Sequence, residues 1–368
     1  MSERHVIALL GRRDEPTDAV EEYCRCLGQA LATHNFQVDI RRVPWNERGW
    51  ASSLDALRLQ AEALRGRWIL VQYTALAWSA RGFPHRLLHV LRVLRKADAR
   101  IAVVFHDAEP FGGTRLIDRL RRAAQVHTMR NALDFSDHAV LTVPPERLSW
   151  PDARSQHLTF IPVGANLPFP LEPQQHELLH TPPTIGVFSI TGGAAGDRET
   201  RDIVAAVRFA SQKLGKARLL VFGRHAETCE QALREALLDC PVEIDVWGVI
   251  AAGELIHRFA ASDVLLFVRG AISSRRGSAI AGIACGLPVI ALQGKETASP
   301  ITDAGVILLS EDFDEATLQS KLGEALMRVF SDNEFRLKLI QRSRAAQKTY
   351  FSWPAIAARY AEFLDANE

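Results

Sequence analysis

The sequence has few of the features that mark membrane-spanning, secreted or metal-binding proteins. No apolar run approaches the roughly 18 residues that a membrane-spanning helix needs. The five cysteines include no Cys-x-x-Cys pair and no histidine-flanked cluster, which argues against a zinc site and a disulfide framework. The first residues lack the charged and apolar regions of a signal peptide. We therefore expect a soluble cytoplasmic protein without a metal or other cofactor.

A strong net charge is also missing, although the charge is unevenly distributed. The 368 residues hold 44 Lys and Arg against 43 Asp and Glu. Residues 81–130 alone hold 11 basic against 4 acidic residues, which favours an anionic partner. No nucleic-acid-binding motif is present, so we expect no nucleic acid partner. We expect residues 81–130 to form a basic, partly apolar surface at the inner face of the cell membrane, with Arg and Leu interleaved over 86–100 and a second basic helix from Arg115. A helix that packs on a core is a nearly equal alternative.

Short apolar segments alternate with helical stretches along the whole chain, which predicts an α/β protein with doubly wound parallel sheets. Several of these segments are apolar almost throughout, as expected for strands that are covered on both faces. In the first half, the predicted strands are Val6–Leu10, Val38–Val43, Trp68–Tyr73, Ile101–Phe105, Ala139–Val143 and Leu158–Ile161. In the second half, they are Ile185–Ile190, Leu219–Phe222, Val242–Trp247, Val264–Val268, Val289–Leu292 and Val306–Leu309.

A proline-rich stretch separates the two series of strands. Six prolines lie between residues 162 and 183, where neither a helix nor a central strand can form. We predict a domain over residues 1–165, a linker over 166–183 and a second domain over 184–350. The carboxyl ends of both sheets are expected to face a central cleft, where such sheets bind ligands.

The strongest local signal for chemistry is a polar loop that leads from the strand Val264–Val268 into a short helix of small residues. The helix begins near Gly277 and Ser278, and the free N–H groups at a helix N-terminus attract anions. Arg275 and Arg276 precede it with no acid nearby in sequence, and guanidinium groups suit phosphate oxygens. The segment predicts a diphosphate site; a buried crossover helix with two solvated arginines is the alternative.

Two strings around this loop resemble family 4 of the GT-B glycosyltransferases. They are Ala261-Ser262-Asp263-Val264 and Ala284-Cys285-Gly286-Leu287-Pro288-Val289. The similarity extends over nearly the whole chain, to Phe351-Ser352-Trp353 before a last helix over 351–368, which in the family crosses back to the first domain. The resemblance implies the GT-B fold, with two Rossmann-like domains that face a cleft. It also implies retaining, metal-independent hexosyl transfer from a nucleotide diphosphate sugar to a glycan, lipid-linked or small-molecule acceptor.

The chain departs from the family at two acidic positions. The two family glutamates, one touching the donor sugar and the other the ribose, would fall at Ser273 and Ala281, where no acid stands. The Ser-Ser-Arg-Arg-Gly-Ser run resembles a bacterial variant of the family. Arg275 or Arg276 is expected to replace the family's phosphate-binding cations, and UDP-, GDP- and dTDP-linked sugars all stay open as donors. The implied donor-binding residues are Thr191, Gly192, Gly193, Arg224, Gly248, Ser273, Ser274, Arg275, Arg276, Gly277 and Ser278.

Polar residues also follow strands of the first domain. His106 and Asp107 come directly after Ile101–Phe105, and the resemblance implies that a histidine near this place contacts the transferred sugar while Asp107 orients it. A structural histidine is the alternative. The loop after the first strand is where the family binds its acceptor, and the acceptor-binding residues expected there are Arg12, Arg13, Asp14 and Thr17.

Two other functions remain open from the sequence. Nucleotide-sugar 2-epimerases share the implied fold and act on the donor without an acceptor. The loss of both glutamates also fits an inactive homologue that binds a nucleotide or a partner transferase.

Overall fold

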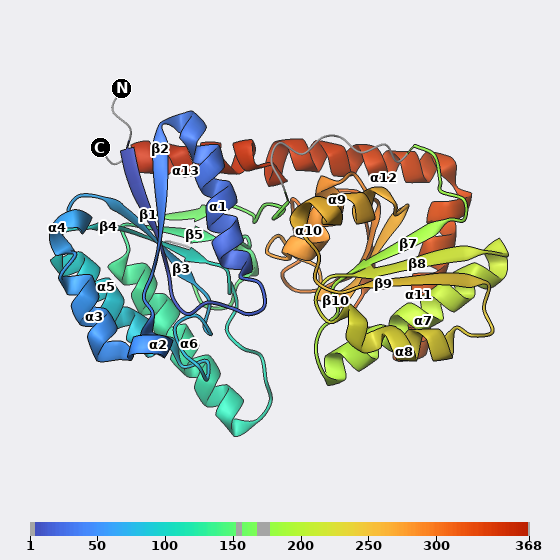
Figure 1. The fold of residues 1–368 in the computed structure, drawn as a ribbon, viewed down its shortest axis with the longest axis horizontal. Helices are drawn as coiled ribbons and strands as arrows, with labels where there is room; N and C mark the ends of the chain where they lie inside the picture. The colour runs from blue at the N-terminus through green and yellow to red at the C-terminus, as the bar shows by residue number, and fades with distance from the viewer. Residues whose placement is uncertain (1–3, 152–156, 168–176, 367–368) are drawn as a thin grey trace. The chain divides into compact units, whose positions relative to one another are not determined.

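The computed structural model describes residues 4–151, 157–167 and 177–366 (Figure 1). The chain divides into two compact units: Met1–Val163 together with Trp353–Glu368, and Gly164–Ser352. The middle of the predicted linker, residues 168–176, lies outside the described residues. Within the described ranges, no helix is both long and apolar enough to cross a membrane.

The first unit contains a six-stranded sheet in which every pair of neighbouring strands is parallel, in the order β2-β1-β3-β4-β5-β6. Its central strand β3 is buried at all six positions, as its continuous apolar character predicts. The strands are β1 (Arg4–Leu10), β2 (Phe36–Arg42), β3 (Trp68–Tyr73), β4 (Arg100–Phe105), β5 (His138–Leu141) and β6 (Leu158–Phe160).

The second unit contains another six-stranded parallel sheet, in the order β12-β11-β10-β7-β8-β9. Its strands are β7 (Thr184–Phe188), β8 (Ala217–Phe222), β9 (Val242–Trp247), β10 (Val264–Ala271), β11 (Val289–Gln293) and β12 (Val306–Ser310). The predicted fold class, two doubly wound Rossmann-like sheets, is confirmed.

Helices cover both sheets (Figure 1). In the first unit they are α1 (Ala19–Leu31), α2 (Trp45–Arg48), α3 (Trp50–Arg58), α4 (Ala61–Leu64), α5 (Leu87–Lys96), α6 (Leu116–Phe135) and α13 (Trp353–Asp365). In the second unit they are α7 (Ala194–Leu214), α8 (Ala226–Ala236), α9 (Ala252–Ala260), α10 (Gly277–Ala284), α11 (Glu315–Ser331) and α12 (Asn333–Ala346). A short π-helical turn, Gln347–Phe351, follows α12.

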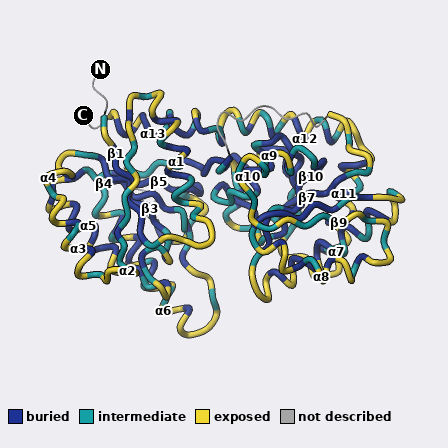
Figure 2. Tube along the Cα trace, viewed as in Figure 1, coloured by how far each residue is buried: buried dark blue, intermediate teal, exposed yellow. Residues whose placement is uncertain are grey.

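The apolar side of α5 belongs to the core of the first unit. Its leucines and valines, from Leu87 to Leu94, are all buried, and its basic residues lie on the opposite side. The apolar face of α5 therefore packs on the core, as the second interpretation of residues 86–100 expected. The N-terminal end of α6, at the lower edge of the first unit in Figure 2, is instead exposed.

The last helix, α13, packs on the first unit through aromatic side chains. The hydroxyl of Tyr360 lies 2.9 Å from that of Tyr23 on α1. The ring of Phe363 stacks on His138 with 4.1 Å between ring centroids. His138 also lies within 2.9 Å of the Thr159 hydroxyl through its Nε2. The residues after Ser352 therefore complete a core that the first 163 residues begin.

His138 should make the stability of this unit depend on pH. Burial, followed by the charge of His157, lowers the pKa of His138 from 6.5 to about 4. Between these two values the unfolded state binds more protons than the folded state, so stability is lost as the pH falls from 6.5 towards 4. We expect the wild type to lose roughly 1 kcal/mol more than His138→Gln between pH 7 and pH 5, after allowing for solvent screening. Urea unfolding at both pH values measures the difference, and equal losses would contradict the prediction.

Candidate functional site

Each sheet reverses its strand order at one point, where loops from two neighbouring strands meet at the carboxyl edge. In the first sheet this point lies between β1 and β3, so the loops that follow Leu10 and Tyr73 meet. In the second sheet it lies between β7 and β10, so the loops that follow Phe188 and Ala271 meet. Most of the site residues predicted from the sequence stand in these four loops.

A pocket of about 250 Å³ opens at the reversal point of the first sheet. It brings together the predicted residues Arg12, Arg13, Asp14 and Asp107, whereas Thr17 and His106 are not among the residues that line it. With Asp18, the pocket holds two cationic side chains and three carboxylates, which suit a polar ligand with several hydroxyl groups.

A close approach of two loops shapes this pocket. A Cβ on Gly11 would lie 2.2 Å from the carbonyl oxygen of Ala77, so only glycine fits there. Arg12 N donates to the same oxygen at 2.8 Å. Arg42 donates to the Gly11 carbonyl at 3.1 Å and pairs with Asp18 and Glu21. Arg42 therefore ties the predicted acceptor loop to the start of α1.

A carboxylate caps the start of α1. Asp18 accepts hydrogen bonds from Val20 N and Glu21 N, as an N-cap residue does. The carboxylate of Glu21 pairs with Arg42, which the sequence alone did not indicate.

Gln72 holds the ring of His106 in one orientation and one tautomer. His106 Nε2 lies 2.8 Å from Gln72 Oε1, while Gln72 Nε2 donates to the Leu70 carbonyl at 3.0 Å. Because a carbonyl can only accept, the amide of Gln72 must present its oxygen to His106. His106 Nε2 therefore carries the proton, and Nδ1 is the unprotonated nitrogen of the neutral ring.

Burial lowers the pKa of His106 from 6.5 to about 4, against the opposite effect of the Asp18 charge. The edge of Tyr23 packs against the ring at 4.9 Å between centroids. The ring is thus neutral at pH 7 and offers an acceptor at Nδ1. Asp107 Oδ2 accepts from Ala75 N at 2.7 Å and so fixes the loop after β3. Gln72 was missed from the sequence, although it is the one polar residue in the strand Trp68–Tyr73.

The glycine-rich loop of the second unit is held by a buried acid. Glu199, 5% exposed, accepts from Thr191 N at 2.8 Å, so this N–H is already used within the protein. Gly192 and Gly193 are exposed, and Gly193 is the N-cap of α7. Thr191, Gly192 and Gly193 also line a groove of about 830 Å³ that continues between α7 and α8 and does not include residues 273–278.

Glu296 binds the first of the two arginines before α10. Arg275 donates to Glu296 through Nε at 2.6 Å and through Nη2 at 2.9 Å, and the Ser273 hydroxyl donates to the same carboxylate at 3.1 Å. Burial opposes the charge of Glu296, but Arg275 holds the pKa of this carboxyl below its ordinary value. No acid lies near Arg275 in the sequence, but Glu296, which follows the neighbouring strand β11, pairs with it in the structure. Ser273 and Ser274 are buried, each 1% exposed.

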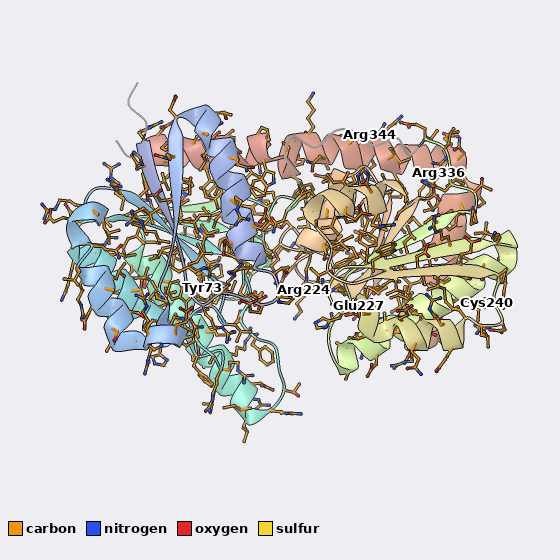
Figure 3. All side chains as sticks on the ribbon, viewed as in Figure 1. Tyr73, Arg224, Glu227, Cys240, Arg336 and Arg344 are labelled. Atoms are coloured by element: carbon orange, nitrogen blue, oxygen red, sulfur yellow. The ribbon has the colours of Figure 1, made fainter. Side chains whose placement is uncertain are left out.

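The remaining predicted donor residues follow neighbouring strands at the same edge. Gly277 and Ser278 open α10, Arg224 follows β8, and Gly248 follows β9. The carboxylate of Glu227 lies against Gly248. Glu227 and Arg224 are labelled in Figure 3. In the described part of the chain, no three histidine, cysteine, aspartate or glutamate side chains gather as a metal site would require.

No family model matches the sequence, and no curated protein matches it significantly. Solved structures do share its fold. HepE from Anabaena, in complex with UDP and glucose, is 12% identical over 99% of this chain and 100% of that chain, with a TM-score of 0.64. A glycosyltransferase from Rickettsia africae is 13% identical over 100% and 99% of the two chains, with a TM-score of 0.66.

A further structure with this fold is described as a 2-epimerase. It is a Listeria monocytogenes protein described as a UDP-N-acetylglucosamine 2-epimerase, 12% identical over 98% and 95% of the two chains, with a TM-score of 0.58. At these identities the likeness concerns the fold. The chain has the two-domain Rossmann-like architecture of the GT-B fold.

Proposed function

We propose that this protein is a glycosyltransferase that takes a hexosyl group from a nucleotide diphosphate sugar. The observation that carries the proposal is that a glycine-rich loop, at 191–193, and the arginines before α10 follow the neighbouring strands β7 and β10 at the reversal point of the second sheet. Backbone N–H groups, a helix N-terminus and guanidinium groups together suit a diphosphate. The UDP and glucose bound to the Anabaena structure support this ligand class.

The proposed donor site comprises the loops at 191–193 and 273–278 with Arg224 and Gly248. The proposed acceptor site is the pocket of the first unit, with Thr17 beside it. His106 would accept a hydrogen bond from a sugar hydroxyl at Nδ1, and Asp107 would keep its loop in place. Positive groups at the leaving diphosphate would stabilise the charge that develops there, in a retaining reaction that needs no metal.

Two other functions lead to different outcomes in the same assays. A 2-epimerase, the description of the Listeria structure, would isomerise or hydrolyse the donor without an acceptor. An inactive homologue would bind nucleotide without turnover.

A thermal-shift screen with UDP, GDP and dTDP tests the proposal first. We expect one of the three to raise the melting temperature. Incubation of the corresponding sugar donors with and without a mixture of glycan acceptors should then give a new glycosidic bond that depends on the acceptor. Failure of all three nucleotides to bind would refute the proposal, and donor conversion without an acceptor would favour the epimerase.

We further propose that the acceptor is reached at an anionic membrane, through the N-terminal end of α6. Leu116 is 77% exposed and Leu120 63% exposed, and the exposed Arg119 lies between them. Apolar side chains beside basic ones enter the headgroup region, where each basic residue contributes roughly 1 kcal/mol.

Sedimentation with anionic vesicles should therefore show binding at low salt that falls at several hundred millimolar salt. The double variant Leu116→Asp/Leu120→Asp should bind less. Leu238→Asp is the matched control, because Leu238 is 86% exposed but lies in the second unit. If the wild type ignores such vesicles at low salt, the membrane proposal fails and a soluble acceptor is favoured.

A further inference from the structure

The end of β10 contains a bulge that takes one arginine out of the regular strand. Between the pairs Phe267–Ala291 and Ala271–Leu292, β10 has three residues and β11 has none. The bulged residues are Val268, Arg269 and Gly270. Gly270 has a φ of 72°, a backbone conformation that favours glycine. A bulge interrupts the alternation of side chains and redirects them. Arg269 therefore lies at the carboxyl edge of the sheet, next to the reversal point.

Arg269 is half-buried and poorly neutralised. Its Nε atom is buried and has no hydrogen-bond partner among the described residues, and no described carboxylate forms an ion pair with it. Its closest polar contact is a long one, 3.5 Å from Nη1 to the hydroxyl of Ser278 in the first turn of α10. Glu199 is the acid whose charge it senses, but a carboxylate oxygen of Glu199 already accepts from Thr191 N.

Other positive charge surrounds Arg269. Burial and the charge of Arg224 lower the pKa of Arg269, against the opposite effect of Glu199. A Cβ on Gly270 would lie 3.9 Å from Nη2 of Arg276, so this second guanidinium also reaches the bulge. Arg275 differs from Arg269, because Glu296 binds it through two hydrogen bonds.

We propose that Arg269 binds a phosphate group of the nucleotide diphosphate, while Arg275 positions the loop through Glu296. This inference rests on the proposed function. An anion between Arg269, Arg276 and the start of α10 would satisfy the buried Nε and offset the repulsion with Arg224. The arginine pair recognised in the sequence thus has two roles, and the residue that binds the ligand with Arg276 comes from the strand before them.

Removing Arg269 and removing Arg275 should affect the stability of the ligand-free protein differently. A half-buried charge without a full counter-charge costs stability in the ligand-free protein, so removing it should not destabilise the fold. Removing Arg275 leaves the carboxylate of Glu296 without its partner, which destabilises.

Calorimetry and thermal unfolding of the full chain test the assignment with the variants Arg269→Gln and Arg275→Gln. Arg234→Gln is the surface control, because Arg234 of the wild type pairs with Glu230 on α8. The probes are UDP, GDP, dTDP, their nucleosides and inorganic pyrophosphate. For the nucleoside diphosphate that the wild type binds, Arg269→Gln should raise Kd at least tenfold and leave the Kd of the nucleoside unchanged. Its ligand-free melting temperature should equal or exceed that of the wild type. Arg275→Gln should lower the melting temperature, and Arg234→Gln should change neither quantity.

Wild-type diphosphate affinity in Arg269→Gln would overturn the assignment, as would a lower melting temperature with equal loss of diphosphate and nucleoside binding. Arg269→Lys provides a second variant that keeps the charge, and it should bind the diphosphate more weakly than the wild type and more tightly than Arg269→Gln. If the wild type binds pyrophosphate through Arg269 but none of the nucleoside diphosphates, the anion site stands and the proposed function fails. If it binds neither, both fail.

Discussion

Replacing Asp263 with alanine is expected to lower the free energy of unfolding of the second unit by about 3 kcal/mol. Asp263 is 3% exposed, and its carboxylate accepts from Thr184 N at 2.7 Å and from His180 N at 3.0 Å. The ring of His180 lies 2.9 Å from the same carboxylate. Alanine would leave these donors without an acceptor, and the N–H of Thr184 is buried away from water. Urea unfolding followed by circular dichroism measures the change.

The exposed pair of Asp239 with Arg208 supplies the control for this experiment. Asp239→Ala should leave the unfolding midpoint unchanged, because a solvent-exposed ion pair contributes little. An unchanged midpoint in Asp263→Ala would contradict the structural role. Asp263, in the Ala-Ser-Asp-Val segment, therefore binds the residues before β7 and the first residue of β7 through hydrogen bonds.

Replacing His106 with alanine is expected to lower kcat for sugar transfer by about 10²-fold or more, the scale of a positioned side chain in the transition state. The Nδ1 acceptor that Gln72 fixes would be lost, while the donor site in the second unit would be untouched. Nucleoside diphosphate affinity should therefore stay at the wild-type value. Transfer assays with the donor identified by thermal shift measure kcat.

His138→Gln is the matched control, because burial also lowers the pKa of His138 to about 4, but its ring stacks on Phe363 instead of contacting the pocket-lining Gln72. Its kcat should equal that of the wild type. Because the pKa of His106 is about 4, its ring stays neutral from pH 8 to pH 6, and protonation of this ring should cause no fall in rate over that range. A His106→Ala variant within threefold of the wild-type rate would reject a role for this side chain.

The sequence predicted the strands well because both sheets are parallel and buried on two sides. Such strands are continuous apolar runs, and their positions can be read without knowing their partners. The end of β10 is the informative exception: the prediction stopped at Val268, whereas the strand continues to Ala271 through a bulge. A bulge depends on the register with the neighbouring strand, so the local pattern did not reveal where Arg269 would lie.

Helix burial shows a similar limit. Interleaved Arg and Leu residues mark α5 as amphipathic, but they do not say what covers its apolar side. In the structure that side is core, whereas Leu116 and Leu120 on α6 are among the exposed apolar residues. Which face of a helix meets the sheet is decided by packing against residues distant in the chain.

By itself, the sequence determined the α/β class, the two series of strands and the loops at which polar residues gather. Each of these follows from the pattern of apolar and polar residues over a short stretch of chain. Only the tertiary structure decided the partners of the ionisable side chains: Glu296 for Arg275, Gln72 for His106 and the Thr191 backbone N–H for Glu199. The physical reason is that hydrogen bonds and ion pairs act over a few ångströms. Strand order, which the sequence does not state, determines which distant residues come within that distance.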